Sequence, residues 1–487
     1  MAHRNKLINI KMVIKVMGFL LMIEAAFMLT SLVFAFYYHE SPVPIAVSAA
    51  ITLVTGVLLW VFSLRKAPKN IGKREGFLIV TLTWLVSSLF GALPYLFSGA
   101  IPSFTNAFFE TMSGFTTTGA SILNDIELLP KYILFWRSMT HWMGGMGIIV
   151  LTVAILPFLG VGGMQLFVAE MPGITPDKLH PRVTATARRF WGIYVILTAA
   201  EVLLLWLGGS MNFFDAVCHS FATMATGGFS TKNNSIVGFT PYDQYVIIVF
   251  MLLAGTNFTL HYFSMHGQIR KVIKNEEFRV YLLIVAIFTV GITLGLMNYN
   301  AQSGEPAFRD ALFAVSSILT TTGFVTANYL IWPAHLWLMI FGLMFIGGMA
   351  GSTGGGVKII RHILLFKNSR LELKRSLHPN ALIPVKYDGR TVSQQIIFNV
   401  MAFFLLYLFL FVIGIFLLTL LGLDLQTSMG ASIASLGNIG PGIGGVGPVE
   451  NYAFIPDAGK WILSFLMLMG RLELFTVLVV LSPSFWK

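Results

Sequence analysis

The feature that most constrains this chain is a series of apolar runs, each about 20 residues long, which recur from one end of the sequence to the other. A helix of that length crosses the hydrocarbon core of a bilayer, which is about 30 Å thick. Only 11% of the 487 residues are charged and 56% are apolar, whereas a soluble domain carries about 25% charged residues. The chain is therefore predicted to be a polytopic membrane protein and not a soluble enzyme.

The runs are apolar on all sides, as residues 396–422 illustrate, whereas a strand of a membrane β-barrel alternates apolar and polar residues. The predicted spans are therefore helical. They lie at 12–38, 44–64, 77–98, 132–158, 190–209, 244–265, 280–297, 335–366, 396–422 and 460–482. These segments predict an all-α polytopic fold. The single cysteine, Cys218, excludes an internal disulfide and a cysteine-ligated metal cluster.

The distribution of basic residues predicts the orientation, because loops on the cytoplasmic side are enriched in Lys and Arg. Most of the 32 Lys and Arg fall in the N-terminal tail and in alternate loops, the last of which covers 358–390. Both termini are therefore expected to be cytoplasmic. The net charge of +11 follows from this topology. No nucleic-acid partner is expected, because that would need a basic stripe with aromatic side chains on a soluble face.

Four shorter apolar segments, about 13 residues each, lie between paired spans on the outer side and are too short to cross a bilayer. In each, a glycine stands thirteen residues after the first residue of a pair that matches in position among the four segments, as Gly119 follows Asn106. The strings that end the four segments are Thr-Thr-Thr-Gly-Ala (116–120), Ala-Thr-Gly-Gly-Phe (225–229), Thr-Thr-Thr-Gly-Phe (320–324) and Gly-Asn-Ile-Gly-Pro (437–441). One such string alone would indicate an ordinary helix C-cap with a left-handed glycine. Four copies at one spacing indicate a fourfold internal repeat.

A short helix that ends inside the membrane directs the negative end of its dipole toward the bilayer interior, which favours cations there. Non-helical backbone at that depth is tolerated where it lines a pore, and glycine lets carbonyl oxygens face the pore axis. Such oxygens can replace the hydration shell of K+, and no charged side chain stands in the strings, so a weakly hydrated monovalent cation fits best. The predicted K+ filter residues are Thr117, Thr118, Gly119, Thr226, Gly227, Gly228, Thr321, Thr322, Gly323, Asn438, Ile439 and Gly440.

A glycine-rich stretch, residues 347–356, interrupts the eighth predicted span. Each glycine costs about 1 kcal/mol relative to alanine in a helix interior, so this stretch is expected to be a movable loop that gates the pore. The predicted gate residues in it are Gly347, Gly348, Gly351, Ser352, Thr353, Gly354, Gly355 and Gly356. Close helix packing of the GxxxG kind is the alternative interpretation. Neither a phosphate-binding loop nor a nucleophile elbow matches the spacing.

Arg471 stands near the centre of the tenth predicted span, eleven residues from both Lys460 and Ser482. A charge at that depth is by default a functional residue with a partner. The candidate partners are carbonyls of the glycine-rich loop and Glu473, which is only two residues away and so is expected to pair across repeats instead. A purely structural ion pair is the alternative.

Four motifs carry a resemblance: Gly-Gly-Met-Gly-Ile-Ile-Val at 144–150, the segment 347–358, Asn-Ile-Gly-Pro-Gly at 438–442 and Gly-Arg-Leu-Glu at 470–473. With these the chain resembles the Trk/Ktr/HKT superfamily of K+ transporters, specifically the bacterial Trk-type membrane subunit. The resemblance implies four pseudo-repeated M1-P-M2 units, like K+-channel subunits, around one pore. It also implies that the four glycines set selectivity and that Arg471 lies below the filter near the gating loop.

The implied domains are a two-span N-terminal domain at 1–70 and four repeats at 71–160, 161–272, 273–378 and 379–487, with the gating loop at 347–356 in the third. The resemblance further implies a homodimer in a bacterial cytoplasmic membrane, bound to a cytosolic nucleotide-binding regulatory ring. K+ is the transported ion, and no covalent cofactor is expected.

Two other classes of function fit the sequence less well. A cation-coupled secondary transporter with alternating access would show paired broken helices in two related halves, whereas this sequence predicts four parallel short segments and one broken helix. A membrane-embedded enzyme would need clustered titratable residues, of which the spans contain too few. The sequence therefore favours K+ uptake through a gated pore, without covalent chemistry.

Overall fold

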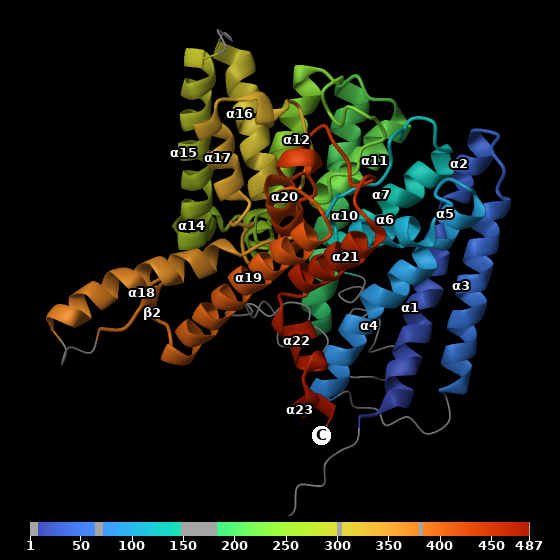
Figure 1. Ribbon diagram of the computed structural model, residues 1–487, viewed down its shortest axis with the longest axis horizontal. Coiled ribbons are helices and arrows are strands. Elements are labelled where there is room, and N and C mark those ends of the chain that lie inside the picture. The colour runs from blue at the N-terminus through green and yellow to red at the C-terminus, as the bar shows by residue number, and fades with distance from the viewer. Residues whose placement is uncertain (1–7, 64–71, 148–182, 300–303, 379–382, 487) are drawn as a thin grey trace, which may run out of the picture.

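The computed structural model describes residues 8–63, 72–147, 183–299, 304–378 and 383–486, and it is built almost wholly of helices (Figure 1). Among these residues six helices are long and apolar enough to cross a membrane, or up to eight if each of two bent pairs counts as one span. Strand structure in the described ranges is confined to an antiparallel hairpin of β1 (Lys386–Tyr387) and β2 (Arg390–Thr391). The predicted all-α polytopic fold is confirmed.

The N-terminal helices form a closely packed pair. Helix α1 (Ile10–Thr30), extended by α2 (Leu32–Tyr37), runs along α3 (Val43–Phe62). The two helices meet at Gly18 and Gly56, where a Cβ on Gly18 would lie 2.6 Å from the Gly56 carbonyl oxygen. Small residues allow backbones to approach in this way where lipid supplies no hydrophobic driving force between helices.

The rest of the chain contains three kinds of helix that succeed one another four times. The outer helices are α4 (Lys73–Gly91, followed by α5, Leu93–Phe97), α10 (Val183–Gly208), α15 (Glu276–Tyr299) and α19 (Gln394–Leu420). The short re-entrant helices are α6 (Phe104–Phe115), α11 (Phe213–Met224), α16 (Gly304–Leu319) and α20 (Leu425–Leu436). The inner helices are α7 (Lys131–Gly145), α12 (Pro241–Ala254), α17 (Ala334–Leu343) and α21 (Asp457–Arg471).

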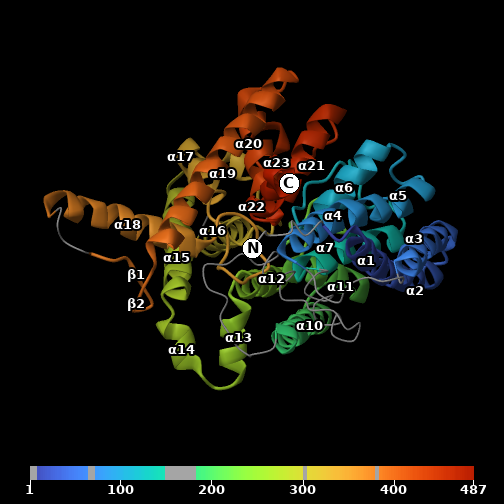
Figure 2. The ribbon, with the colours of Figure 1, turned by 90° about the horizontal axis from the view of Figure 1, so that it is seen from below.

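Seen from below, these groups follow one another around a common centre (Figure 2). Inner helix α7 packs on re-entrant helix α11, and α12 packs on α16. The last inner helix, α21, packs on the first re-entrant helix, α6, so the arrangement closes on itself. This is the arrangement that four M1-P-M2 units around one centre would produce.

Side-chain caps explain where three of the re-entrant helices begin. Ser103, Asn212 and Asp424 each accept a hydrogen bond from the backbone N–H three residues later and so satisfy a free donor of the first turn. Bonds from the Thr427 side chain and backbone also hold the pKa of the Asp424 carboxyl below its usual value. Inner helix α12 starts with a capping box between Thr240 and Asp243.

The predicted spans at 244–265 and 460–482 are each divided into two helices by a sharp bend. Helix α12 is followed by α13 (Phe258–Met265) at an angle of 104°, and α21 is followed by α22 (Phe475–Leu481) at 117°. In the eighth predicted span the residues between α17 and α18 (Ile359–Leu377) are not α-helical. Helix α7 ends at Gly145, and the remainder of the fourth predicted span lies outside the described residues. A helix end after the first half of the inner segment is thus common to all four groups.

The remaining elements are short. Helices α14 (Ile269–Lys274) and α23 (Pro483–Trp486) and the 3-10 turns Tyr329–Ile331 and Gly444–Val446 complete the described structure.

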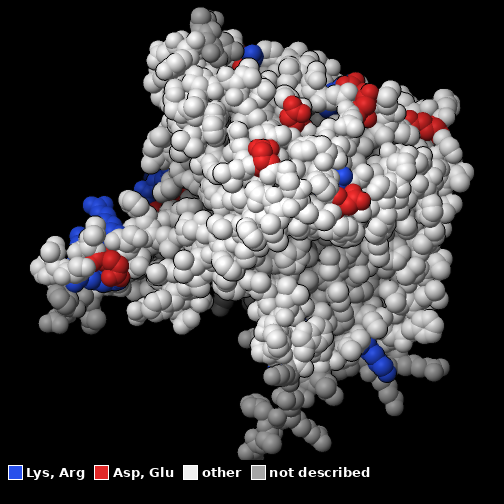
Figure 3. Space-filling model, viewed as in Figure 1, with Lys and Arg blue, Asp and Glu red and all other residues white. Residues whose placement is uncertain are grey.

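The surface differs in charge and polarity from one part to another. On the face shown in Figure 3, most acidic residues lie over the upper part, and basic residues gather around α18. Helix α19 exposes large apolar side chains at Leu405, Phe409, Val412 and Phe416, the spacing of one helix face. Such a face is suited to contact with lipid.

Candidate functional site

The re-entrant helices all end in the same backbone motif. The residue after the capping position has a positive φ in each: 53° at Thr117, 54° at Thr226, 59° at Thr321 and 53° at Asn438. The next residue donates its N–H, at 2.8 Å in every copy, to a carbonyl five residues earlier: Thr118 to Ser113, Gly227 to Ala222, Thr322 to Ser317 and Ile439 to Ala434. This is the Schellman C-cap, here with threonine or asparagine where glycine is usual. Non-glycine residues in this conformation cost about 1–3 kcal/mol each and cluster at functional sites.

The predicted selectivity glycine of each string is a second left-handed position, two residues further on. The φ angles are 81° at Gly119, 81° at Gly228, 82° at Gly323 and 94° at Gly440. The residue between the two left-handed positions has a negative φ in every string. Each string therefore contains a helix C-cap and, two residues later, a left-handed glycine, so the cap residue and the predicted selectivity glycine are different residues.

The strings meet edge to edge in a closed ring. A Cβ on Gly119 would lie 2.2 Å from the carbonyl oxygen of Gly227, and one on Gly228 would lie 2.1 Å from that of Thr322. The cycle continues from Gly323 to Ile439 at 2.0 Å and closes from Gly440 to Thr118 at 2.6 Å. Real Cβ atoms essentially never come so close to another atom, so the ring has no room for a side chain at the four glycines. Segments more than 300 residues apart in sequence thus form one continuous wall.

Above the ring lies a hollow that opens to solvent, and its empty space together with the adjoining solvent is about 540 Å³. All four ring glycines line it, together with residues such as Arg137, Lys232, Glu450 and Tyr452. Tyr452 donates its hydroxyl hydrogen to the Gly440 carbonyl at 2.6 Å and so helps to fix the backbone of the fourth string.

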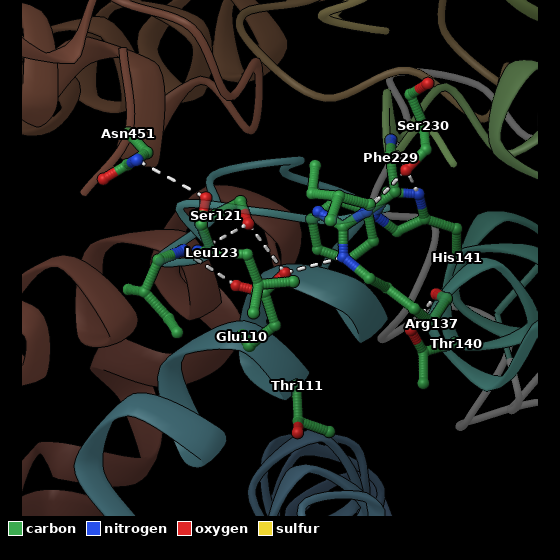
Figure 4. Close-up of polar contacts among 12 residues, drawn as sticks. Glu110, Thr111, Ser121, Leu123, Arg137, Thr140, His141, Phe229, Ser230 and Asn451 are labelled. Carbon is green, nitrogen blue, oxygen red and sulfur yellow. Dashed lines mark hydrogen bonds and ion pairs between the residues drawn. The ribbon is translucent and has the colours of Figure 1, made fainter. Parts of the chain in front are cut away.

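A buried ion pair between Glu110 and Arg137 braces the first and second strings (Figure 4). Glu110 of α6 accepts hydrogen bonds from the Arg137 side chain at 2.7 Å, from the Ser121 hydroxyl at 2.9 Å and from the Ile122 N–H at 2.9 Å. Arg137 of α7 donates a further bond to the Ser230 carbonyl at 2.9 Å. The pair therefore fixes the segments just after Gly119 and Gly228 relative to each other. Sequence analysis missed this role, although a glutamate inside an apolar re-entrant segment is itself an indication of function.

Two tyrosines hold the ends of the first two inner helices in the same way. Tyr194 of α10 donates to the Trp142 carbonyl at 3.0 Å, and Tyr281 of α15 donates to the Leu252 carbonyl at 3.1 Å. Each acceptor lies in the last turn of its inner helix. Tertiary contacts of this kind satisfy carbonyls that a continuous helix would have bonded itself.

The glycine-rich loop lies directly beneath the ring. Its Gly355 N–H donates to the Thr321 hydroxyl at 2.6 Å, which joins the loop to the third filter string. Thr353 donates its hydroxyl hydrogen to the Ala254 carbonyl at 3.1 Å, at the end of α12. A Cβ on Gly355 would lie 2.6 Å from the Gly437 carbonyl oxygen at the start of the fourth string.

The loop is also folded tightly on itself. Gly347 donates its N–H to the Val357 carbonyl at 2.9 Å, and a Cβ on Gly347 would lie 2.2 Å from the Gly355 carbonyl oxygen. Gly351 and Gly356 have φ angles of 75° and 64°. Of the other predicted gate residues, Gly348 and Gly354 are buried in the loop and Ser352 donates its hydroxyl hydrogen to the Met349 carbonyl. The structure thus brings the predicted gate residues together, and their close contacts explain the glycine content.

Arg471 joins the loop to the first repeat. It is the last residue of α21, and its guanidinium donates to the Thr353 carbonyl at 2.8 Å and to the Thr117 hydroxyl at 3.1 Å. It also donates to the carbonyls of Gly144 and Gly145 at the end of α7. Of the two predicted partners, the loop carbonyl is present. Glu473 pairs instead with Arg361 of α18, a contact across repeats.

Asn438 gives the fourth string a contact that threonine could not make. Its side-chain amide donates to the Thr118 hydroxyl at 3.0 Å and to the Met467 carbonyl at 2.9 Å. One hydrogen bond thus crosses from the fourth string to the first, and the other reaches inner helix α21. Asparagine also tolerates the left-handed backbone better than most residues.

We expect Asn438→Ala to lower the free energy of unfolding by about 2 kcal/mol, because it removes two buried hydrogen bonds worth about 1 kcal/mol each. Thermal unfolding of the purified protein in detergent measures the change. Ser435→Ala, three residues earlier in the last turn of α20, is the control, since the Ser435 hydroxyl has no hydrogen-bond partner within the described ranges. Equal losses of stability in the two variants would contradict the role given to the amide.

A helical membrane protein in which four re-entrant segments close one ring belongs to the class of ion-transporting membrane proteins. The comparison with known proteins identifies the group within this class. The chain belongs to the TrkH family of cation transport proteins, whose pattern it matches over residues 41–487.

Individual relatives agree with this assignment. The Trk system potassium uptake protein TrkH of Escherichia coli (strain K12) is 45% identical over 442 residues, which are 90% of this chain and 91% of that protein. The protein of the same name from Vibrio parahaemolyticus is 42% identical over 483 residues, 98% of this chain and 99% of that one. The crystal structure of the potassium transporter TrkH from Vibrio parahaemolyticus superposes with a TM-score of 0.89 at 38% identity, over 99% of this chain and 100% of the other. The predicted family is confirmed, and the protein is a multi-pass membrane transporter and not an enzyme.

Proposed function

We propose that this chain takes up K+ across the cytoplasmic membrane of a bacterium through one pore, whose selectivity filter is the ring closed by Gly119, Gly228, Gly323 and Gly440. The observation that carries the proposal is the closed cycle of backbone contacts, in which each glycine abuts a carbonyl of the next string. Relatives at 45% and 42% identity are named potassium uptake proteins, which supports K+ as the ion.

The backbone of the strings suits a carbonyl-lined filter. A chain segment whose φ angles alternate in sign turns successive carbonyls to one side, whereas in an ordinary strand they alternate between two sides. Each string has this alternation over three residues, such as Thr117 to Gly119. Four segments of this kind can surround a cation with backbone oxygens and replace its hydration shell without any charged side chain.

The glycine-rich loop is the proposed gate, because it lies on the inner side of the filter and is bonded to Thr321 of the ring. Arg471 supports this role in two ways. It holds the loop through the Thr353 carbonyl, and it places a fixed positive charge beside Thr117, where a cation would leave the filter. Two like unit charges about 4 Å apart repel by about 4 kcal/mol at an effective dielectric constant of 20. The loop and the arginine together therefore oppose permeation at rest.

The orientation and the partners form the second part of the proposal. The start of α1 and the C-terminal helix α23 lie on the same side, opposite the re-entrant helices (Figure 1). The basic residues of α18 project on that half of the molecule (Figure 3). We assign this side to the cytoplasm, where a nucleotide-binding regulatory ring would dock on a homodimer of the chain. The relatives are named as parts of a Trk system, which supports the existence of partner subunits.

The decisive experiment is ion flux into proteoliposomes that contain the purified chain. We expect uptake of K+ and Rb+ in preference to Na+, down an electrochemical gradient and with a rate that varies with voltage. Adding the nucleotide-binding subunits should change the rate. Equal uptake of K+ and Na+ would contradict the assignment of the ring as a selectivity filter. A rate that does not change when the subunits are added would contradict the proposed regulation by a nucleotide-binding partner.

A cation-coupled transporter with alternating access is the second candidate. The bends after α12 and α21 favour it, because discontinuous helices form ion sites in such proteins. They also remove the argument that only one span is broken. However, the helix ends that the described residues show in all four inner segments follow the fourfold pattern of the ring rather than a twofold pattern of halves. Uphill K+ accumulation driven by a Na+ or H+ gradient in the same liposomes would support the coupled mechanism instead.

A further inference from the structure

We propose that Glu277 is a positioning residue of the gate, and that its carboxylate clasps the glycine-rich loop on both sides of the run from Gly351 to Gly356. This proposal rests on the proposed function, in which the loop obstructs the pore. Glu277 stands in the first turn of α15 and is only 3% exposed. One oxygen, Oε1, accepts the backbone N–H of Ala350 at 2.9 Å and that of Ile360 at 3.1 Å.

The two donors lie on either side of six of the eight predicted gate residues in the loop. Ala350 precedes the run from Gly351 to Gly356, and Ile360 is in the first turn of α18, which follows the loop. A single oxygen that accepts from both positions fixes the distance between the two sides of this run. Neither N–H has a backbone acceptor in its own segment, since Ala350 is not helical and Ile360 is among the free donors of a helix start.

A carboxylate in the first turn of a helix often serves only its own helix. Glu277 differs, because it accepts hydrogen bonds from the loop and from α18. The neighbouring Glu276 shows the contrast. Its carboxylate accepts the Asp388 N–H of the β1–β2 hairpin at 3.2 Å and pairs with Lys367, both at the surface. Two adjacent glutamates therefore serve different parts of the molecule, which makes Glu276 a matched control.

Loss of the clasp should free the loop without disturbing the filter. If the acceptor is removed, the Ala350 and Ile360 N–H groups lose their partner in a buried place, and displaced arrangements of the loop that hydrate them become relatively more favourable. The atoms nearest to an added Cβ at the ring glycines belong to the neighbouring strings and not to Glu277. Flux should rise while the preference among cations stays the same, which separates a positioning role in the gate from a general structural role.

The test compares Glu277→Met with Glu277→Gln in proteoliposomes, with Rb+ and Na+ uptake normalised to protein that elutes as a single size-exclusion peak. Gln keeps an oxygen acceptor in the same place, whereas Met has the same length and no oxygen. We expect Rb+ uptake to rise about tenfold or more in Glu277→Met and to stay within about twofold of wild type in Glu277→Gln, with unchanged Rb+ over Na+ preference. Glu276→Gln should match wild type.

Equal Rb+ uptake by Glu277→Met and wild type would overturn the proposal, and so would an equal rise in the Gln and Met variants, which would assign the effect to charge. If Glu277→Met does not fold, Glu277→Asp decides the question. Its shorter side chain cannot reach both donors, so it should show a smaller rise, and wild-type uptake would overturn the clasp. A wild-type chain that takes up no K+ or Rb+ would refute the proposed function itself, whereas a conducting wild type with unaltered variants refutes only the clasp.

Discussion

Serine in place of Gly119 or Gly323 is expected to lower the preference for K+ over Na+ by at least about tenfold, a change of about 1.4 kcal/mol in relative barrier height. The reason is local geometry. At Gly119 the backbone has a φ of 81°, and the added Cβ would lie 2.2 Å from the Gly227 carbonyl oxygen. At Gly323 the φ is 82° and the nearest atom is the Ile439 oxygen at 2.0 Å. Strain of about 1–3 kcal/mol and the steric overlap must both be relieved, and the atoms that move are the carbonyls of the ring.

The measurement is the ratio of Rb+ to Na+ uptake in proteoliposomes. Gly99→Ser is the matched control, because Gly99 also has a positive φ, 71°, but nothing lies within 4 Å of the added Cβ. It should carry the backbone strain and leave the ion preference intact. Filter variants that fold well and retain the wild-type preference would show that the ring does not discriminate between the ions.

The repeats could be predicted from the sequence because local chemistry repeats with them. A helix that must end inside the membrane needs a residue in the left-handed conformation and a position where another backbone segment can approach closely. Residues suited to these two needs occur four times in the sequence, at the same thirteen-residue spacing. The sequence did not indicate which residue of each cap is left-handed. That residue is Thr117, Thr226, Thr321 or Asn438, because the chain turns directly after the helix and the ring contacts force a residue other than glycine into that conformation.

The bends in two inner helices were missed because their sequences contain few helix breakers. Only Gly255 stands at the first bend, and the second falls at Glu473 and Leu474, which adopt φ angles of 52° and 58°. Neither residue prefers that backbone. Glu473 is tied there by its pair with Arg361, more than 100 residues earlier in the chain. Sequence reasoning that relies on local composition cannot detect a break maintained by a distant partner.

The same limit applies to the residues that support the site. Glu110 and Arg137 are separated by 27 residues, and Glu277 is 73 residues from Ala350, the nearer of its two donors. A buried charge in an apolar segment identifies each as a candidate, but only the folded chain shows which group it bonds. The predicted filter and gate residues, by contrast, lie in continuous strings whose unusual composition is visible without the fold.

Removing the charge of Arg471 is expected to produce the largest change in flux. The guanidinium lies beneath the first filter string, bonded to Thr117, and holds the loop through the Thr353 carbonyl. If a permeating cation must pass within about 4 Å of it, the repulsion of about 4 kcal/mol slows passage by about a thousandfold. Arg471→Met should therefore raise K+ and Rb+ flux toward that limit and weaken the dependence of flux on the regulatory subunits.

The contributions of charge and hydrogen bonding can be separated. Arg471→Lys keeps the positive charge but presents it at one point, so it cannot serve Thr353, Gly144 and Gly145 together. If charge dominates, the lysine variant should stay near the wild-type flux. Removal of residues 351–355, which deletes the part of the loop bonded to Arg471 and Thr321, should raise flux even with the arginine present. Because Arg471 is bonded to the Thr353 carbonyl within the deleted segment, the two changes share a contact, and their effects should fall short of additivity when combined.

A purely structural arginine makes the opposite prediction. In that case Arg471→Met would leave the Gly144, Gly145 and Thr353 carbonyls without their donor, and stability would fall without any gain in flux. The control is Arg361→Met, which strands the Glu473 carboxylate in the same region and should lower stability while leaving flux per folded molecule unchanged. Rubidium uptake per correctly folded molecule distinguishes the two roles. Well-folded Arg471→Met protein with flux at or below the wild-type rate would exclude the arginine from gating, because the charge would then lie off the path that the ion takes.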